Sequence, residues 1–161
     1  MSKTKTIAYF GIGIALYVVL SMVMKIPIIG HIQTDLGYIV FSVYLALFGW
    51  QALTIGVVGC MIESLIINGW IPIGWMVGQA IIGIICGLVF QKYNKNSLKI
   101  LWILISVFLG IGCCKTLIEC FLYDIPVMVK FPRNIIAFIP DSFAMILGLY
   151  ISDLIKDKVK T

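Results

Sequence analysis

The chain has 161 residues, of which 61% are hydrophobic and 12% are charged, and its formal net charge is +5. A soluble domain of this size carries about a quarter charged residues, so the composition excludes a soluble globular protein. The mean hydropathy of +1.10 and the long apolar runs predict an integral membrane protein. Lipid permits only helices or closed barrels, and long unbroken runs favour helices, so we expect an all-α fold.

Hydropathy predicts one membrane domain, residues 1–161, built as a bundle of six transmembrane helices. The expected spans cover about residues 5–24, 36–50, 52–69, 73–91, 98–122 and 134–155. The second and third are short and meet at an uncharged corner, Phe48-Gly49-Trp50-Gln51. One of that pair could instead be re-entrant, which would leave five spans or fewer. The first run is too long for a signal-peptide core, so we expect it to remain as a helix.

Lysines predict the orientation of the bundle. They cluster before the first span, in the loop QKYNKNSLK and after the last span: Lys3, Lys5, Lys92, Lys95, Lys99, Lys156, Lys158 and Lys160. An even number of spans separates each cluster from the next, so the positive-inside rule puts all three clusters and both termini in the cytoplasm. The outer face then consists of residues 25–35, 68–72 and 123–133, whose prolines favour a structured lid over a flexible connector.

The spans contain few ionisable residues, and all of them fall in the expected outer half: Glu63, Lys115, Glu119 and Asp141. Such groups are costly in lipid and usually mark a site or pathway. Lys115 and Glu119 are four residues apart and share a helix face, so one alternative is that they only neutralise each other. Glu63 has no cation one turn away in its own helix, so it needs a partner on another span or a ligand.

A cavity open to the outside would satisfy these groups together. Asp35, Tyr38 and Gln79 are expected at the depth of Glu63. Trp70 and Trp75 would provide flat walls, although Trp70 is equally well explained as part of the aromatic belt at the membrane surface. Lys25 and Lys130 are likewise explained singly as interfacial anchors. A flat heteroaromatic ligand, with an acidic group held by Lys115 or Arg133, fits such a cavity.

Small residues recur one turn apart on two of the expected helices. Gly74 with Gly78 and Gly83 with Gly87 follow this pattern in the fourth span, where packing within the bundle is the simplest interpretation. In the first span the pair is Gly11 and Ala15. Packing within the bundle is the default there too, and contact with another membrane protein is the second interpretation.

Several catalytic motifs are absent from the sequence. No phosphate-binding loop, His-Glu-x-x-His or Gly-x-Ser-x-Gly motif is present, and the single histidine cannot build a usual metal cluster. The five cysteines show no Cys-x-x-Cys spacing. We therefore expect no enzyme activity, no cofactor, no metal and no nucleic-acid partner. The chain is expected to bind a solute and to take its energy from other proteins.

These features resemble the S components of energy-coupling factor (ECF) transporters, which capture vitamins in bacteria and archaea. The resemblance rests on the six-span pattern, on the small-residue face of the first helix, and on the block KIPIIGHIQTDLGYIVFSVYLALFGWQALTIGVVGCMIESLI. The stretches NGWIPIGWMVGQAIIGIICGLVF and KFPRNIIAFIP are also similar to family segments. The overall pattern is closest to the folate and riboflavin branches, although no motif identifies the vitamin.

The resemblance implies a multi-pass protein of the plasma membrane that binds a vitamin or related metabolite in an outward-facing pocket. It also implies partners: a membrane scaffold, contacted through Gly11 and Ala15, and two cytoplasmic ATPases that drive the toppling of the bundle. The family pocket maps onto His31, Gln33, Asp35, Trp70, Trp75, Gln79, Lys115, Glu119, Arg133 and Asn134, and the buried charge of the third span adds Glu63. Two alternatives remain, a small membrane enzyme acting on lipid or isoprenoid substrates and a purely structural protein.

Overall fold

The computed structural model describes residues 3–23, 26–29 and 32–160, with the side chains of residues 4–23 and 35–156. His31 lies outside the described residues, and Gln33 is described only by its backbone. In chain order the elements are α1 (Lys3–Val23), β1 (Ile26–Ile29), β2 (Ile32–Thr34), α2 (Gly37–Phe48), η1 (Gly49–Ala52), α3 (Leu53–Asn68), α4 (Ile73–Lys92), α5 (Asn96–Val107), η2 (Phe108–Lys115), α6 (Thr116–Tyr123) and α7 (Val127–Lys160).

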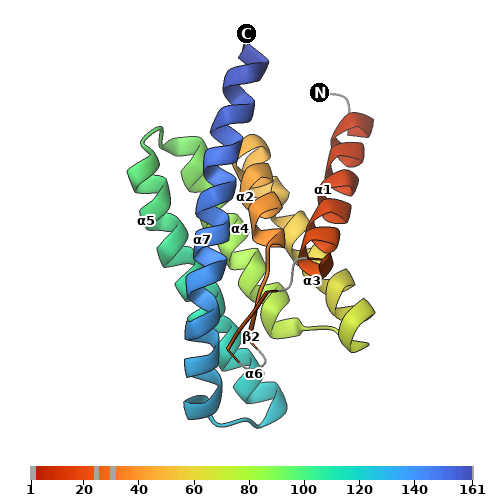
Figure 1. Cartoon of the computed structure of the whole chain (residues 1–161), viewed down its shortest axis with the longest axis vertical. Coiled ribbons are helices and arrows are strands. Elements are labelled where there is room, and N and C mark those ends of the chain that lie inside the picture. The colour runs from red at the N-terminus through yellow and green to blue at the C-terminus, as the bar shows by residue number, and fades with distance from the viewer. Residues whose placement is uncertain (1–2, 24–25, 30–31, 161) are drawn as a thin grey trace.

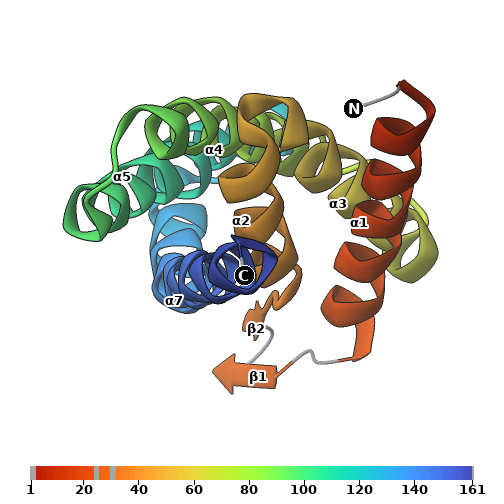
Figure 2. The same ribbon diagram turned by 90° about the horizontal axis from the view of Figure 1, so that it is seen from above.

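The helices form an elongated bundle with two distinct ends (Figure 1). The start of α1, the link from α4 to α5 and the end of α7 lie at one end, here called the terminal end. The β-hairpin, the link from α3 to α4 and the link from α6 to α7 lie at the other, here called the distal end. Seen from above, α2 and α7 lie side by side, with α1 at one edge of the bundle and α5 at the other (Figure 2).

Five helical segments in the described part of the chain are long and apolar enough to cross a membrane, where six were expected. These segments are Thr4–Val23, Gly37–Asn68, Ile73–Lys92, Asn96–Tyr123 and Val127–Lys156. The expected second and third spans both fall within the second segment, because α2, η1 and α3 follow one another directly in the chain. Taken singly, α2 with 12 residues and α3 with 16 residues are shorter than the roughly 20 residues that a straight span needs.

The chain nevertheless reverses direction between α2 and α3. Gly49 begins η1 with a φ of 69°, a backbone conformation that residues other than glycine rarely adopt. From this turn at the terminal end, α3 runs back toward the distal end (Figure 1). The uncharged corner noted in the sequence is therefore a true turn.

The segment between the first two helices contains a β-hairpin, which was not predicted. β1 pairs with β2 antiparallel, with Ile26 opposite Thr34 and Ile29 opposite Ile32. A hydropathy profile marks residues 25–35 only as an interruption between apolar runs. The isoleucines in this segment, however, favour extended backbone. β2 also lies against α7, which attaches the hairpin to the bundle at the distal end.

The last helix begins earlier than predicted. Residues 123–133 were assigned to an external loop, but α7 starts at Val127 and includes Lys130 and Arg133. The Pro126 carbonyl accepts hydrogen bonds from the backbone N–H groups of Val129, at 2.9 Å, and Lys130, at 3.3 Å. Proline is tolerated at a helix start because the N–H that it lacks would have no helical partner there.

The expected fifth span corresponds to α5, η2 and α6, but η2 is a π-helix rather than an α-helix. Here Gly110 packs backbone to backbone against Gly78 of α4. A Cβ atom added to either glycine would lie 2.7 Å from the carbonyl oxygen of the other. Such close approach confirms that the Gly74–Gly78 pattern packs within the bundle. Gly83 and Gly87 of the same helix also pack closely, against α3 and η1.

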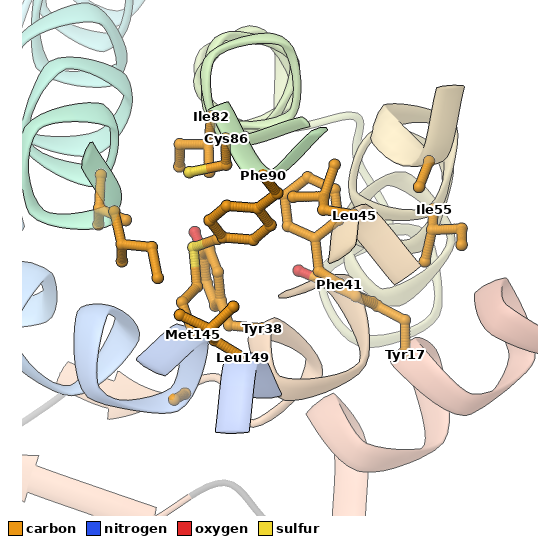
Figure 3. Packing of buried hydrophobic residues seen from close by; sticks show 14 of the residues in the cluster. Tyr17, Tyr38, Phe41, Leu45, Ile55, Ile82, Cys86, Phe90, Met145 and Leu149 are labelled. Atoms are coloured by element: carbon orange, nitrogen blue, oxygen red, sulfur yellow. The ribbon is translucent and has the colours of Figure 1, made fainter. Parts of the chain in front are cut away.

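The buried core lies between α2, α4 and α7, with contributions from α1 and α3 (Figure 3). Its largest fully buried side chains include Tyr38 and Phe41 of α2, Ile82 of α4 and Met145 of α7. Large apolar side chains are exposed along most helices, as expected for a surface that faces lipid rather than water.

Candidate functional site

A pocket of about 240 Å³ lies at the distal end of the bundle, and we call it the polar pocket. Side chains from α3, α4, η2, α6 and α7 and from the link between α3 and α4 line it. These residues are Ser64, Asn68, Trp70, Pro72, Trp75, Lys115, Glu119, Lys130, Arg133 and Asn134. The structure therefore brings together Trp70, Trp75, Lys115, Glu119, Arg133 and Asn134, all of which were site candidates from the sequence.

Trp75 and Lys115 form the centre of the polar pocket. The Lys115 Nζ lies 5.0 Å from the centroid of the Trp75 ring, within the range of a cation–π contact. The Trp75 Nε1–H donates a 3.2 Å hydrogen bond to the hydroxyl of Tyr38, which is fully buried on α2. This bond holds the indole ring by its N–H edge, while the cation of Lys115 lies over the ring.

Glu119 pairs across the polar pocket rather than along its own helix. Its Oε2 lies 3.0 Å from the Nζ of Lys130 on α7. Glu119 therefore forms its ion pair with Lys130 and not with Lys115, which was the alternative considered from the sequence. From the sequence, Lys130 was interpreted as an interfacial anchor. Hydropathy gave no sign that α7 begins before it, so it was assigned to an external loop.

Asn134 is positioned by the end of the π-helix. Its Nδ2 donates a 2.8 Å hydrogen bond to the Thr116 hydroxyl, and that hydroxyl in turn lies 3.5 Å from the Ile111 carbonyl oxygen. On α3, the Asn68 Nδ2 donates to the Ser64 hydroxyl at 3.3 Å. Ser64 was not a sequence candidate, since a small polar residue within an apolar run is common in membrane helices.

Asp35 and Gln79 were expected in the pocket but do not line it. Both are buried in a network between α1, α2 and α4. The Asp35 carboxylate accepts hydrogen bonds from the Tyr17 hydroxyl at 2.8 Å, from the Ser21 hydroxyl and from the Gly37 backbone N–H at 2.8 Å. The Gln79 Nε2 donates to the Tyr17 hydroxyl at 3.1 Å. These two residues therefore brace the bundle beneath the pocket.

Glu63 is also buried and does not line the polar pocket. Asp141 of α7 interacts electrostatically with Asp35, Lys115 and Glu63, so it lies within electrostatic range of all three. Lys115 therefore lines the polar pocket and also interacts with the charge of a buried carboxylate. Within the described ranges, no three His, Cys, Asp or Glu side chains are grouped as a metal site requires.

Two further surfaces differ in character from the polar pocket. A second pocket, of about 400 Å³, lies between α1, α2 and α7 and has no charged side chain in its lining, so it does not suit a polar solute. On α1, Gly11 and Ala15 are exposed, and a Cβ on Gly11 would meet nothing within 4 Å. Among the described residues, this small-residue face is thus not used for packing within the bundle.

Comparison with known proteins identifies the family. Residues 1–157 match the family model described as "ECF-type riboflavin transporter, S component". The structure is similar to a crystal structure of the S component for biotin from an ECF-type ABC transporter. The TM-score is 0.67 and the sequence identity 15%, and the match covers 98% of this chain and 95% of that chain. At such low identity this likeness establishes the fold alone.

Two curated relatives come from Streptococcus thermophilus. The UPF0397 protein of strain ATCC BAA-491 / LMD-9 is 27% identical over 116 residues, and UPF0397 protein stu0306/stu0307 of strain ATCC BAA-250 / LMG 18311 is 26% identical over 118 residues. Each match covers 68% of this chain and 64% of the relative, so the chain spans less than two thirds of their length. The family match covers nearly the whole sequence and confirms the resemblance: the chain belongs to the family of S components of ECF-type riboflavin transporters.

Proposed function

We propose that this chain is the substrate-binding subunit of an ECF-type importer and captures a vitamin or related heteroaromatic micronutrient in the polar pocket. The observation that carries the proposal is the contact between Trp75 and Lys115 in a pocket at one end of a membrane bundle. A flat apolar surface beside a small set of convergent polar groups is typical of small-molecule sites.

The size and lining of the polar pocket favour a compact ligand. Its volume of about 240 Å³ lies just below the usual range of about 300–1,000 Å³ for ligand pockets, so one or two fused rings suit it. Trp75 supports a ring from one side. Trp70, whose ring packs edge to face with that of Tyr123 at 5.7 Å, forms an outer wall. His31 and Gln33 remain candidates because the hairpin that contains Gln33 lies at the same end of the bundle.

The membrane topology that we propose has six crossings and both termini in the cytoplasm. It is supported by the turn at Gly49, which sends α3 back toward the distal end, and by the position of the start of α1 and the end of α7 at the terminal end (Figure 1). The lysine-rich link between α4 and α5 lies at that end too, in agreement with the positive-inside rule. The polar pocket then faces the outside.

Release of the ligand inside the cell requires partners. We propose that the exposed face at Gly11 and Ala15 contacts a membrane scaffold, since a small-residue face lets another helix approach closely. Two cytoplasmic ATPases would supply the energy through that scaffold, and the bundle would topple to deliver the ligand inward. An enzyme acting on lipids is less well supported, because the carboxylate that lines the polar pocket, Glu119, is paired with Lys130 and lies at the distal end, away from the proposed cytoplasmic end.

The proposal is tested by thermal unfolding of the detergent-solubilised protein with a panel of vitamins at micromolar concentrations, including riboflavin and biotin. At least one member should raise the unfolding temperature, because a ligand that binds only the folded state stabilises it. The shift should vanish in Trp75→Ala and persist in Trp50→Ala, whose side chain is half exposed on η1, next to Gly87 in the second half of α4. A full panel without any stabilisation would contradict the proposal.

A further inference from the structure

The lining of the polar pocket carries an excess of positive charge. Three of its side chains are cationic, Lys115, Lys130 and Arg133, and one, Glu119, is a carboxylate. Glu119 is already paired with Lys130, at 3.0 Å. Two cations, Lys115 and Arg133, therefore remain in one small pocket that has no further acidic side chain in its lining.

These two cations differ in their surroundings. Lys115 contacts Trp75 and interacts electrostatically with the buried Asp141, so the Asp141 carboxylate offsets part of the lysine charge. Arg133 is exposed at the pocket and takes part in no ion pair with any residue that the structure describes. Its guanidinium can donate two parallel hydrogen bonds to an oxyanion, which a lysine amine cannot do.

Building on the proposed function, we propose that the ligand carries a carboxylate or phosphate group, which binds between Arg133 and Lys115 while its ring lies against Trp75. The positions of the three residues support this arrangement, because all three line the same pocket of about 240 Å³. A neutral ligand would leave Arg133 without an anionic partner among the described residues and the charge of Lys115 only partly offset, whereas an oxyanion would pair with both cations. The polar pocket thus selects the anionic member of a pair of otherwise similar molecules.

The test uses pairs of probes that share a ring system and differ in charge: nicotinate and nicotinamide, biotin and biotinamide, riboflavin 5′-phosphate and riboflavin. Thermal unfolding and equilibrium binding are measured at low salt on the full chain in detergent. For at least one pair, the anionic member should bind at least about tenfold more tightly than its neutral partner, as a charge-assisted bidentate contact allows. Comparison of the carboxylate probes, nicotinate and biotin, with the phosphate probe, riboflavin 5′-phosphate, shows which oxyanion the pocket prefers.

Two variants connect this preference with the pocket. Arg133→Gln should weaken the anionic member at least about tenfold and leave neutral members within about twofold, and Arg133→Lys should retain part of the preference. Lys92→Gln, at the terminal end of α4, serves as the control for a general loss of positive charge. Because Arg133 is exposed, its replacement should leave the unfolding temperature without ligand unchanged.

The possible failures are distinguishable from failure of the proposed function. If neutral members bind as tightly as anionic ones, or if Arg133→Gln leaves the preference intact, this inference is wrong while the proposed function stands. If no probe of either charge binds and mass spectrometry finds no small molecule released from the purified protein, both are wrong, whereas release of only a neutral molecule overturns this inference alone. An anionic molecule released by wild type and absent from Arg133→Gln would support the inference without any of the chosen probes.

Discussion

The Tyr17 hydroxyl donates a 2.8 Å hydrogen bond to the Asp35 carboxylate, eighteen residues away, and accepts a 3.1 Å bond from Gln79. One side chain on α1 thus joins the start of α2 to the middle of α4. Gln79 lies one helical turn after Trp75, which lines the polar pocket. The helix that carries Gly11 and Ala15 is therefore braced directly against the helix that carries the pocket wall.

Replacing Tyr17 by phenylalanine should destabilise the bundle. The change removes both hydrogen bonds and leaves buried polar atoms of Asp35 and Gln79 with fewer partners, which costs about 1–3 kcal/mol per unsatisfied group. We expect a lower unfolding temperature in detergent. Tyr150→Phe is the matched control, because that hydroxyl belongs to a residue that is 49% exposed on α7. Equal unfolding temperatures for the two variants would show that the hydrogen bonds of Tyr17 contribute little to the stability of the bundle.

A pair of glycine substitutions tests the close contact between α4 and the π-helix. Gly78→Ala would place a Cβ atom 2.7 Å from the Gly110 carbonyl oxygen, so the helices must separate, at a cost of about 1–3 kcal/mol. Gly11→Ala meets nothing within 4 Å and should keep or slightly raise stability. Thermal unfolding of both variants checks this, and a Gly78→Ala protein as stable as Gly11→Ala would contradict the packing described here.

The exposed face of α1 should be needed for transport but not for binding. Gly11→Leu combined with Ala15→Leu would block close approach of another helix, so vitamin uptake by cells should be abolished while binding by the purified chain is retained. Leu16→Met, a conservative change at an exposed position on a different face of the same helix, should leave both intact. Loss of binding in the double variant would mean that this face supports the pocket instead.

Part of the lining of the polar pocket could be anticipated from the sequence, because polar and aromatic residues within apolar runs are visible in one dimension. Trp75, Lys115 and Asn134 were candidates and line this pocket, and their role in binding stays a prediction. The position of Asp35 could not be predicted, since its partners Tyr17 and Ser21 lie on another helix. Sequence spacing alone cannot show which helix faces will meet.

Three elements of the fold were missed for a related reason. The π-helix contains Gly110, which packs against Gly78 thirty-two positions earlier, and no local pattern reveals such a contact. The start of α7 depends on Pro126, which resembles a loop residue in a hydropathy profile. The β-hairpin is too short to give a reliable alternating pattern. As a result Lys130, which pairs with Glu119 at the pocket, was not among the predicted site residues.

The claim that a small molecule binds at Trp75 is tested most directly by the amount of ligand that the purified chain releases on heating, measured per chain by mass spectrometry. We expect release of one heteroaromatic compound from wild type and from Trp50→Ala, and release lower by about tenfold or more from Trp75→Ala. Trp75→Phe, which keeps a flat ring in the polar pocket, should release most of the wild-type amount. Equal release from Trp75→Ala and Trp50→Ala, with both variants folded, would contradict binding at Trp75.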